Sequence, residues 1–249
     1  MGDMTLLIDL FSRVERQGPG GKIAVQRALE LAQLDSDLDL KMADIGCGTG
    51  ASTRILANRL RGEITAVDLM PQFIQAVQSQ NLKPAARCSI KPLVASMESL
   101  PFQDNYFDVI WSEGAIYNMG FLNGITSWHR FLKRNGILVV SEITWLTQKR
   151  PIELQSHWEN IYPEVAMASE KIAQLEQNGY APIGYFPLPE YCWRQEYYEP
   201  LKAQFPDFLK SNANSEAAKA LVDTELQEMA LYEQYSQYYG YGVYIARKL

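Results

Sequence analysis

The glycine-rich segment Ala43-Asp44-Ile45-Gly46-Cys47-Gly48-Thr49-Gly50 constrains the fold of this chain more than any other feature. A short apolar run ends where its glycines begin, and a helical pattern starts at Ser52. Glycine allows the backbone to turn tightly and to approach a ligand closely, and the N-terminus of the following helix attracts polar or negative groups. The segment therefore predicts a strand, a tight turn and a helix that together form a ligand-binding edge.

Strand and helix patterns alternate from Lys41 onward. Because strands that alternate with helices form a parallel sheet with both faces covered, this region predicts an α/β fold with a doubly wound, mainly parallel sheet. Asn135-Gly136 is expected to end the last helix of the region. We expect strands at 42–45, 63–68, 89–94, 107–111 and 137–143, and helices at 52–60, from Pro71 and at 121–132.

The two ends of the chain have other patterns. Apolar spacing predicts two N-terminal helices, one at 5–16 and one after the break at Gly18-Pro19-Gly20-Gly21. No proline-, glycine- or serine-rich linker follows later, so we predict one domain over 1–249, with a helical lid at 1–40, a ligand-binding core at 41–148 and a helical insertion at 188–239. Toward the C-terminus we expect helices at 164–178, 195–205 and 215–238, and strands at 180–186 and 241–247.

The composition argues against several classes of partner. Hydrophobic residues make up 47% of the 249 residues and charged residues 21%, which is ordinary for a globular protein, and the net charge is −6. An acidic chain without a Lys/Arg run has little means of holding a phosphate backbone, so we expect no nucleic-acid partner. No stretch is long and apolar enough to span a bilayer, and Met1-Gly2-Asp3-Met4 has no basic segment, so we expect neither a membrane partner nor a signal peptide.

The cysteines and histidines do not have the spacing of metal ligands. Because the cysteines are few and odd in number, they fit a reducing compartment better than a disulfide framework. We therefore expect a cytoplasmic protein without a structural metal. The residues concerned are Cys47, Cys88, Cys192, His129 and His157.

An acid follows the second expected strand of the core. Asp68 ends that strand at the carboxyl edge of the sheet, where open α/β folds bind ligands, and its carboxylate can accept hydrogen bonds from both hydroxyls of a ribose. Gly46, Gly48 and Ala51 also satisfy the fingerprint of dinucleotide-binding proteins, so these positions do not name the ligand. The glycines could also serve only to make a tight turn, with Cys47 as a small buried residue.

Five segments in order resemble the motifs of class I S-adenosylmethionine-dependent methyltransferases. An acid two residues before the glycines, as in Asp44, belongs to this family's first motif, whereas a dinucleotide site has no need of it. The five together are most similar to the small-molecule branch related to the ubiquinone and menaquinone C-methyltransferases. The segments are Asp44–Gly50, Ile64–Asp68, Ser96–Phe102, Phe107–Ser112 and Leu132–Gly136.

The resemblance implies a fold and a cofactor. The fold is Rossmann-like, with a mainly parallel seven-stranded sheet whose last strand is antiparallel, and the cofactor is S-adenosylmethionine. Asp44 is implied to help hold the methionine ammonium and Asp68 the ribose. The implied cofactor-binding residues are Asp44, Gly46, Cys47, Gly48, Gly50, Asp68, Leu69, Ser96, Met97, Glu98 and Glu113.

Two positions depart from the family pattern. Ser96 stands where an acid usually takes the adenine amino group, and its hydroxyl could accept the same hydrogen bond without charge. Arg134-Asn135 stands where Pro-Gly is common, and we interpret this as a variant of the turn.

Glu113 and Tyr117 are the candidates for the chemistry of methyl transfer, because both follow the fourth core strand. Glu113 could face the methionine or the acceptor, or could cap a turn. Tyr117 could line the acceptor pocket or belong to the core. Ser112-Glu113-Gly114-Ala115 lacks the Asn/Asp-Pro-Pro-aromatic motif of nucleic-acid amino-methyltransferases, which argues against a nucleobase acceptor.

The C-terminal insertion is rich in aromatic residues, which suit either helix packing or a pocket for an aromatic or cationic acceptor. We favour packing for most of them. They are Tyr191, Trp193, Tyr197, Tyr198, Tyr232, Tyr235 and Tyr238.

The sequence thus predicts an enzyme that transfers a methyl group from S-adenosylmethionine to a small-molecule acceptor. One alternative is a nicotinamide-dependent oxidoreductase, which the glycine fingerprint also fits. The other is a non-catalytic protein that binds S-adenosylmethionine. The acceptor, the atom methylated, the use of a general base and the oligomeric state are not specified by these motifs.

Overall fold

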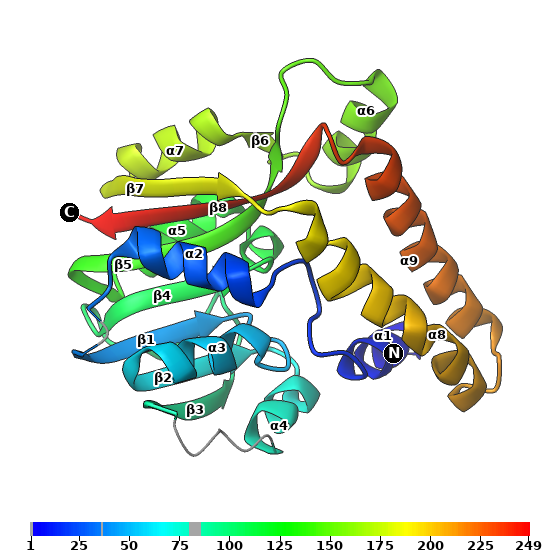
Figure 1. Cartoon of the computed structure of the whole chain (residues 1–249), viewed down its shortest axis with the longest axis horizontal. Coiled ribbons are helices and arrows are strands. Elements are labelled where there is room, and N and C mark those ends of the chain that lie inside the picture. Colours follow the sequence, from blue (N-terminus) through cyan, green and yellow to red (C-terminus); the bar gives the residue numbers. More distant parts are fainter. Residues whose placement is uncertain (1, 36, 80–85) are drawn as a thin grey trace.

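A twisted sheet forms the centre of the protein, which we describe from a computed structural model over residues 2–35, 37–79 and 86–249. The strands lie in the order β3-β2-β1-β4-β5-β8-β7, and the short β6 also pairs with β5 (Figure 1). The strands from β3 to β5 are parallel, and β8 is antiparallel to both β5 and β7. The predicted antiparallel last strand is therefore confirmed. The bounds are β1 Asp39–Ile45, β2 Arg61–Asp68, β3 Cys88–Val94, β4 Phe107–Glu113, β5 Leu132–Trp145, β6 Ala166–Met167, β7 Tyr180–Pro187 and β8 Tyr239–Lys248.

Helices cover both faces of the sheet and bury two separate sets of apolar side chains. On one face α2 (Lys22–Ala32), α3 (Ala51–Arg59) and α4 (Pro71–Ser79) pack against the first set. On the other face α5 (Phe121–His129) and α7 (Ala168–Gln177) pack against the second. The alternation of strand side chains between the two faces produces this division, as expected for a doubly wound sheet.

Three further helices lie beyond the carboxyl ends of the parallel strands (Figure 1). They are α1 (Gly2–Ser12), α8 (Glu199–Ser211) and α9 (Glu216–Tyr235). A π-helical turn, η3 (Arg194–Tyr198), leads into α8. Because α8 and α9 lie in the chain between β7 and β8, the helical stretch that we predicted before the last strand is present.

The structure differs from the sequence prediction at three places. The helix expected to end at Asn135-Gly136 ends at His129, and β5 already begins at Leu132. Asn135 has a φ of 65° and lies where the register between β4 and β5 shifts, so these residues form an irregularity within a strand. The first helix ends at Ser12 instead of Arg16. The residues after it continue toward the turn at 46–50, which Gln17 contacts at Thr49.

The third difference is α6 (Ile152–Ile161), which the sequence analysis did not predict. Leu154, Trp158 and Ile161 have helical spacing, although Leu154 is the only buried residue of this helix. None of the described helices is both long and apolar enough to cross a membrane.

Candidate functional site

A cleft of about 440 Å³ opens at the carboxyl ends of β1, β2 and β4. Leu7 and the segment 16–19 complete its wall from the N-terminal side. Of the predicted site residues, only Gly50 does not line the cleft; it precedes α3 with a φ of 86°. Those that line it are Asp44, Gly46, Cys47, Gly48, Asp68, Leu69, Ser96, Met97, Glu98, Glu113 and Tyr117.

The glycine turn (Gly46–Gly50) is tied to β2 and leaves no room for a side chain at Gly46. The backbone N–H groups of Gly46 and Cys47 donate to the carbonyl of Val67 at 2.8 and 2.9 Å. Gly46 has a φ of 73°, and a Cβ there would collide with the side chain of Ala115. The turn therefore requires glycine at this position for two reasons: the positive φ, and the lack of space for a Cβ beside Ala115.

Asp68 is held in place by the turns on either side of it. Its Oδ2 accepts the N–H of Gly48 at 2.9 Å, and its Oδ1 accepts the N–H of Met70 at 2.9 Å. Burial raises the pKa of Asp68, and these backbone hydrogen bonds act in the opposite direction. The carboxylate is thus fixed at the cleft wall by backbone donors.

Asp44 is more deeply buried, with 2% of its surface exposed. Its Oδ2 accepts a hydrogen bond from the Thr53 hydroxyl on α3 at 2.5 Å. Burial raises its pKa to about 7, the Thr53 hydrogen bond lowers it, and the charge of Glu113 raises it further. A cation that entered the cleft here would favour the charged form of Asp44.

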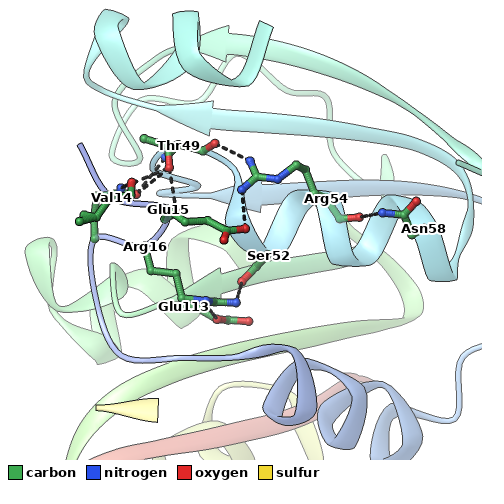
Figure 2. Close-up of polar contacts among 9 residues, drawn as sticks. Val14, Glu15, Arg16, Thr49, Ser52, Arg54, Asn58 and Glu113 are labelled. Atoms are coloured by element: carbon green, nitrogen blue, oxygen red, sulfur yellow. Dashed lines mark hydrogen bonds and ion pairs between the residues drawn. The ribbon is translucent and has the colours of Figure 1, made fainter. Parts of the chain in front are cut away.

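Both carboxylate oxygens of Glu113 have side-chain partners. Oε1 accepts from the indole Nε1 of Trp111 at 2.8 Å, and Oε2 accepts from Nη1 of Arg16 at 3.2 Å. Arg16 also donates to the hydroxyl of Ser52 at 3.3 Å, so it links Glu113 to α3 (Figure 2). The N–H of Gly114 is bound by Ser141, so that turn is capped by Ser141 rather than by Glu113.

The N-terminal segment is bonded directly to the glycine turn (Figure 2). The side-chain oxygen of Gln17 accepts the N–H of Thr49 at 2.9 Å, and the Thr49 hydroxyl donates to the carbonyl of Glu15 at 2.9 Å. Arg54 bridges the carbonyl of Thr49 and the carboxylate of Glu15, each at 2.9 Å. No local pattern marked Arg16 or Gln17, because their partners are far away in the sequence.

The segment after β3 is held by side-chain to backbone bonds. The Ser96 hydroxyl accepts the N–H of Glu98 at 3.2 Å, and the indole of Trp128 donates to the carbonyl of Met97 at 3.1 Å. The Ser96 hydroxyl therefore already accepts one hydrogen bond within its own loop. It also lacks the negative charge of the acid that is usual at this position in the family.

Tyr117 lines the cleft from a short 3-10 turn, with 41% of its surface exposed. Its ring meets that of Tyr162 edge-on at 6.1 Å. Most aromatic residues of the C-terminal insertion are buried, and Trp193 stacks on Tyr232 at 4.3 Å. Trp193 and Tyr232 therefore contribute to the packing of the helices, as we expected for most of these residues.

The cysteines and histidines lie apart from one another. Cys47, Cys88 and Cys192 are free thiols, and burial raises the pKa of each. Within 2–35, 37–79 and 86–249, no group of three or more His, Cys, Asp or Glu side chains could hold a metal ion.

Comparison with known proteins finds a domain family whose model matches the core. Residues 43–140 match the family described as a methyltransferase domain. The chain is similar to the chloroplastic tocopherol O-methyltransferase of Arabidopsis thaliana, with 35% identity over 74 residues, covering 29% of this chain and 21% of that protein. It is also similar to a ubiquinone/menaquinone biosynthesis C-methyltransferase of Paraburkholderia phymatum, with 28% identity over 143 residues, covering 55% and 58%. The matched region is thus only part of each curated relative.

Solved structures share the whole fold. A methyltransferase of Geobacter sulfurreducens, described as dependent on S-adenosylmethionine and solved with S-adenosylhomocysteine, superposes with a TM-score of 0.81. The alignment covers 100% of this chain and 98% of that one at 18% sequence identity. The N-terminal and C-terminal helices outside the matched domain therefore also belong to the shared fold.

Proposed function

We propose that this chain, whose core is a methyltransferase domain of the class I fold, transfers a methyl group from S-adenosylmethionine to a small-molecule acceptor. One observation carries the proposal: the glycine turn, Asp44 and Asp68 meet in a single cleft at the switch point of the sheet. Ligands bind at that position in open α/β folds. The relatives include O- and C-methyltransferases of small molecules, so the proposal extends no further than that class of acceptor.

The cleft fits S-adenosylmethionine in size and in the chemistry of its wall. About 440 Å³ lies within the range of small-ligand pockets. Carboxylates of Asp68 and Asp44 suit a ribose diol and an ammonium group. Gly46 and Gly48 let the backbone of the turn pack closely against Ala115 and Gln17, where a Cβ would collide with their side chains.

We assign roles to the remaining predicted residues on the same basis. We assign Glu113 to the methionine end together with Asp44, because both line the cleft and the charge of Glu113 acts on Asp44. Backbone groups at Cys47 and Gly50 shape the turn. The adenine end is lined by Leu69, Ser96, Met97 and Glu98.

The donor brings its own reactive methyl group on a sulfonium centre when it is bound. The task of this chain is then to orient the acceptor and exclude water. Arg16 holds Glu113 in one orientation, and Tyr117 presents its partly exposed ring to the cleft. The segment 16–19 covers the glycine turn, and we propose that residues 1–40 act as the lid of a single domain.

The alternative of a nicotinamide-dependent oxidoreductase has weaker support. Tyr198 and Lys202 have the Tyr-x-x-x-Lys spacing of such enzymes, but neither lines the cleft. The Tyr198 hydroxyl is bound to Glu228, and Lys202 is exposed.

Because the cysteines of this chain are free, we also propose a cytoplasmic location.

The test is methyl transfer itself. The purified chain is incubated with S-adenosylmethionine labelled in its methyl group and with a small-molecule extract of cells. We expect label in one or a few small molecules, and loss of most of that label with Asp68→Ala. Binding of S-adenosylhomocysteine without any transfer would favour the non-catalytic alternative, and absence of both would contradict the proposal.

A further inference from the structure

An unusual turn in the C-terminal insertion points two tyrosines inward. η3 (Arg194–Tyr198) is π-helical, and Tyr197 and Tyr198 are both buried, with ring centroids 5.0 Å apart. A regular α-helix sets consecutive side chains about 100° apart, whereas the wider π turn is rare and often marks functional sites. Tight helix packing alone does not need such a turn.

Two carboxylates of α9 face these tyrosines. Glu225 and Glu228 are three residues apart and so lie on one face of the helix. Oε1 of Glu228 accepts the hydroxyl of Tyr198 at 3.0 Å. Glu225 is only 7% exposed, and its Oε2 is buried without a hydrogen-bond partner in the described part of the chain.

No cation compensates these two acids among the residues that the structure describes. Burial raises the pKa of Glu225 to about 7, and Glu228 is the only other group that acts on it. Burial also raises the pKa of Glu228, opposed only by the hydroxyl of Tyr198. Glu228 is exposed and bonded to Tyr198, whereas the buried carboxylate of Glu225 has no counter-charge, which is unfavourable, so Glu225 in particular needs a functional reason.

Aromatic rings connect these side chains to the rim of the cleft: the ring of Trp193 lies 6.0 Å from that of Tyr198 and 5.0 Å from that of Tyr241. Tyr241 packs on Gly114, which lines the cleft: its Cε2 lies 2.9 Å from where a Cβ of Gly114 would be. Burial raises the pKa of Tyr117 and of Tyr241, and the charge of Glu228 adds to both effects. We call this set the acidic tyrosine cluster: Tyr117, Tyr197, Tyr198, Tyr241, Glu225 and Glu228.

We propose that the acidic tyrosine cluster binds the ammonium group of an organic amine, and that this amine is the methyl acceptor or part of it. The inference rests on the proposed function, since it names the acceptor class of the same cleft. Glu225 and Glu228 supply the counter-charge, and the faces of the tyrosine rings attract a cation. A neutral acceptor such as a hydroquinone would leave both acids without a counter-charge.

Titration calorimetry at pH 8 with two cationic probes and one neutral probe tests the inference. The cations are benzylamine and benzyltrimethylammonium, and the neutral probe is benzyl alcohol. In the presence of S-adenosylhomocysteine we expect at least one cation to bind about ten-fold or more tighter than the alcohol. Glu225→Gln and Glu228→Gln should each remove most of that preference, whereas Asp223→Asn on the exposed face of α9 should retain it.

The outcomes separate the inference from the proposed function. Equal affinity for all three probes, or a cation preference unchanged in folded Glu225→Gln and Glu228→Gln, overturns the inference. If S-adenosylhomocysteine binds and the cations do not, the inference fails while the proposed function stands. If the cations bind but S-adenosylhomocysteine does not, the proposed function fails and the acceptor assignment fails with it. If a variant does not fold, the comparison of cationic and neutral probes on the wild-type protein still tests the inference.

Discussion

At the scale of single residues, Glu113 is the side chain whose role the structure narrows most. Trp111 and Arg16 hold its two oxygens, so the carboxylate has one orientation at the cleft wall. Ser141 satisfies the neighbouring turn, which removes the need for Glu113 as a cap. Two roles are left: holding the methionine ammonium together with Asp44, or contacting the acceptor.

We predict that Glu113→Gln weakens S-adenosylhomocysteine binding more than it lowers turnover at saturating cofactor. The reason is that the amide loses the charge facing the ammonium and leaves Arg16 unpaired. The expected loss of binding is about 1–3 kcal/mol, the usual scale of a hydrogen bond to a charged group. Calorimetry and saturation kinetics measure the two effects, with Glu216→Gln as an exposed control. Lower turnover at unchanged affinity would instead assign Glu113 to the acceptor.

At the scale of elements, the sequence predicted what local periodicity encodes. The five core strands and the helices between them follow the alternation of apolar residues, and Asp44 and Asp68 were placed by the strands that they end. The contact of Gln17 with Thr49 spans 32 residues and that of Arg16 with Glu113 spans 97, so no local pattern could show either. The acids of α9 were missed for the same reason, because the contact of Glu228 with Tyr198 spans 30 residues.

The covering segment yields a prediction of its own. Gln17→Ala removes the acceptor for the N–H of Thr49 and the donor to the carbonyls of Phe11 and Val14. We expect about 1–2 kcal/mol lower stability and weaker S-adenosylhomocysteine binding, because the glycine turn loses its cover. Urea unfolding and calorimetry measure these, and Gln75→Ala at an exposed position of α4 is the matched control. Identical behaviour of the two variants would show that the segment does not support the turn.

At the scale of the whole molecule, buried acids make the stability of the protein depend on pH. Burial raises the pKa of Asp44 and of Glu225 to about 7 in the folded state. In the unfolded chain both titrate near 4. The folded state therefore binds more protons between these values, so the free energy of unfolding falls as pH rises from about 4 through 7.

We accordingly predict that the ligand-free protein is more stable at pH 5 than at pH 8, by about 1–3 kcal/mol for each of these groups. Urea unfolding at the two pH values measures the difference. Glu225→Gln should reduce the slope, because its amide does not titrate, whereas exposed Asp223→Asn should not. Greater stability at pH 8, or an unchanged slope in folded Glu225→Gln, would show that these acids are not uncompensated.

The whole account depends on the identity of the ligand in the cleft. Titration calorimetry with S-adenosylhomocysteine and with NAD, on the wild type and on Asp68→Ala, tests it most directly, with exposed Asp37→Ala as the control. We predict that S-adenosylhomocysteine binds the wild type and NAD does not, and that folded Asp68→Ala binds about 1–3 kcal/mol more weakly while Asp37→Ala is unchanged. Binding of NAD in place of S-adenosylhomocysteine, or full affinity in folded Asp68→Ala, would contradict the account.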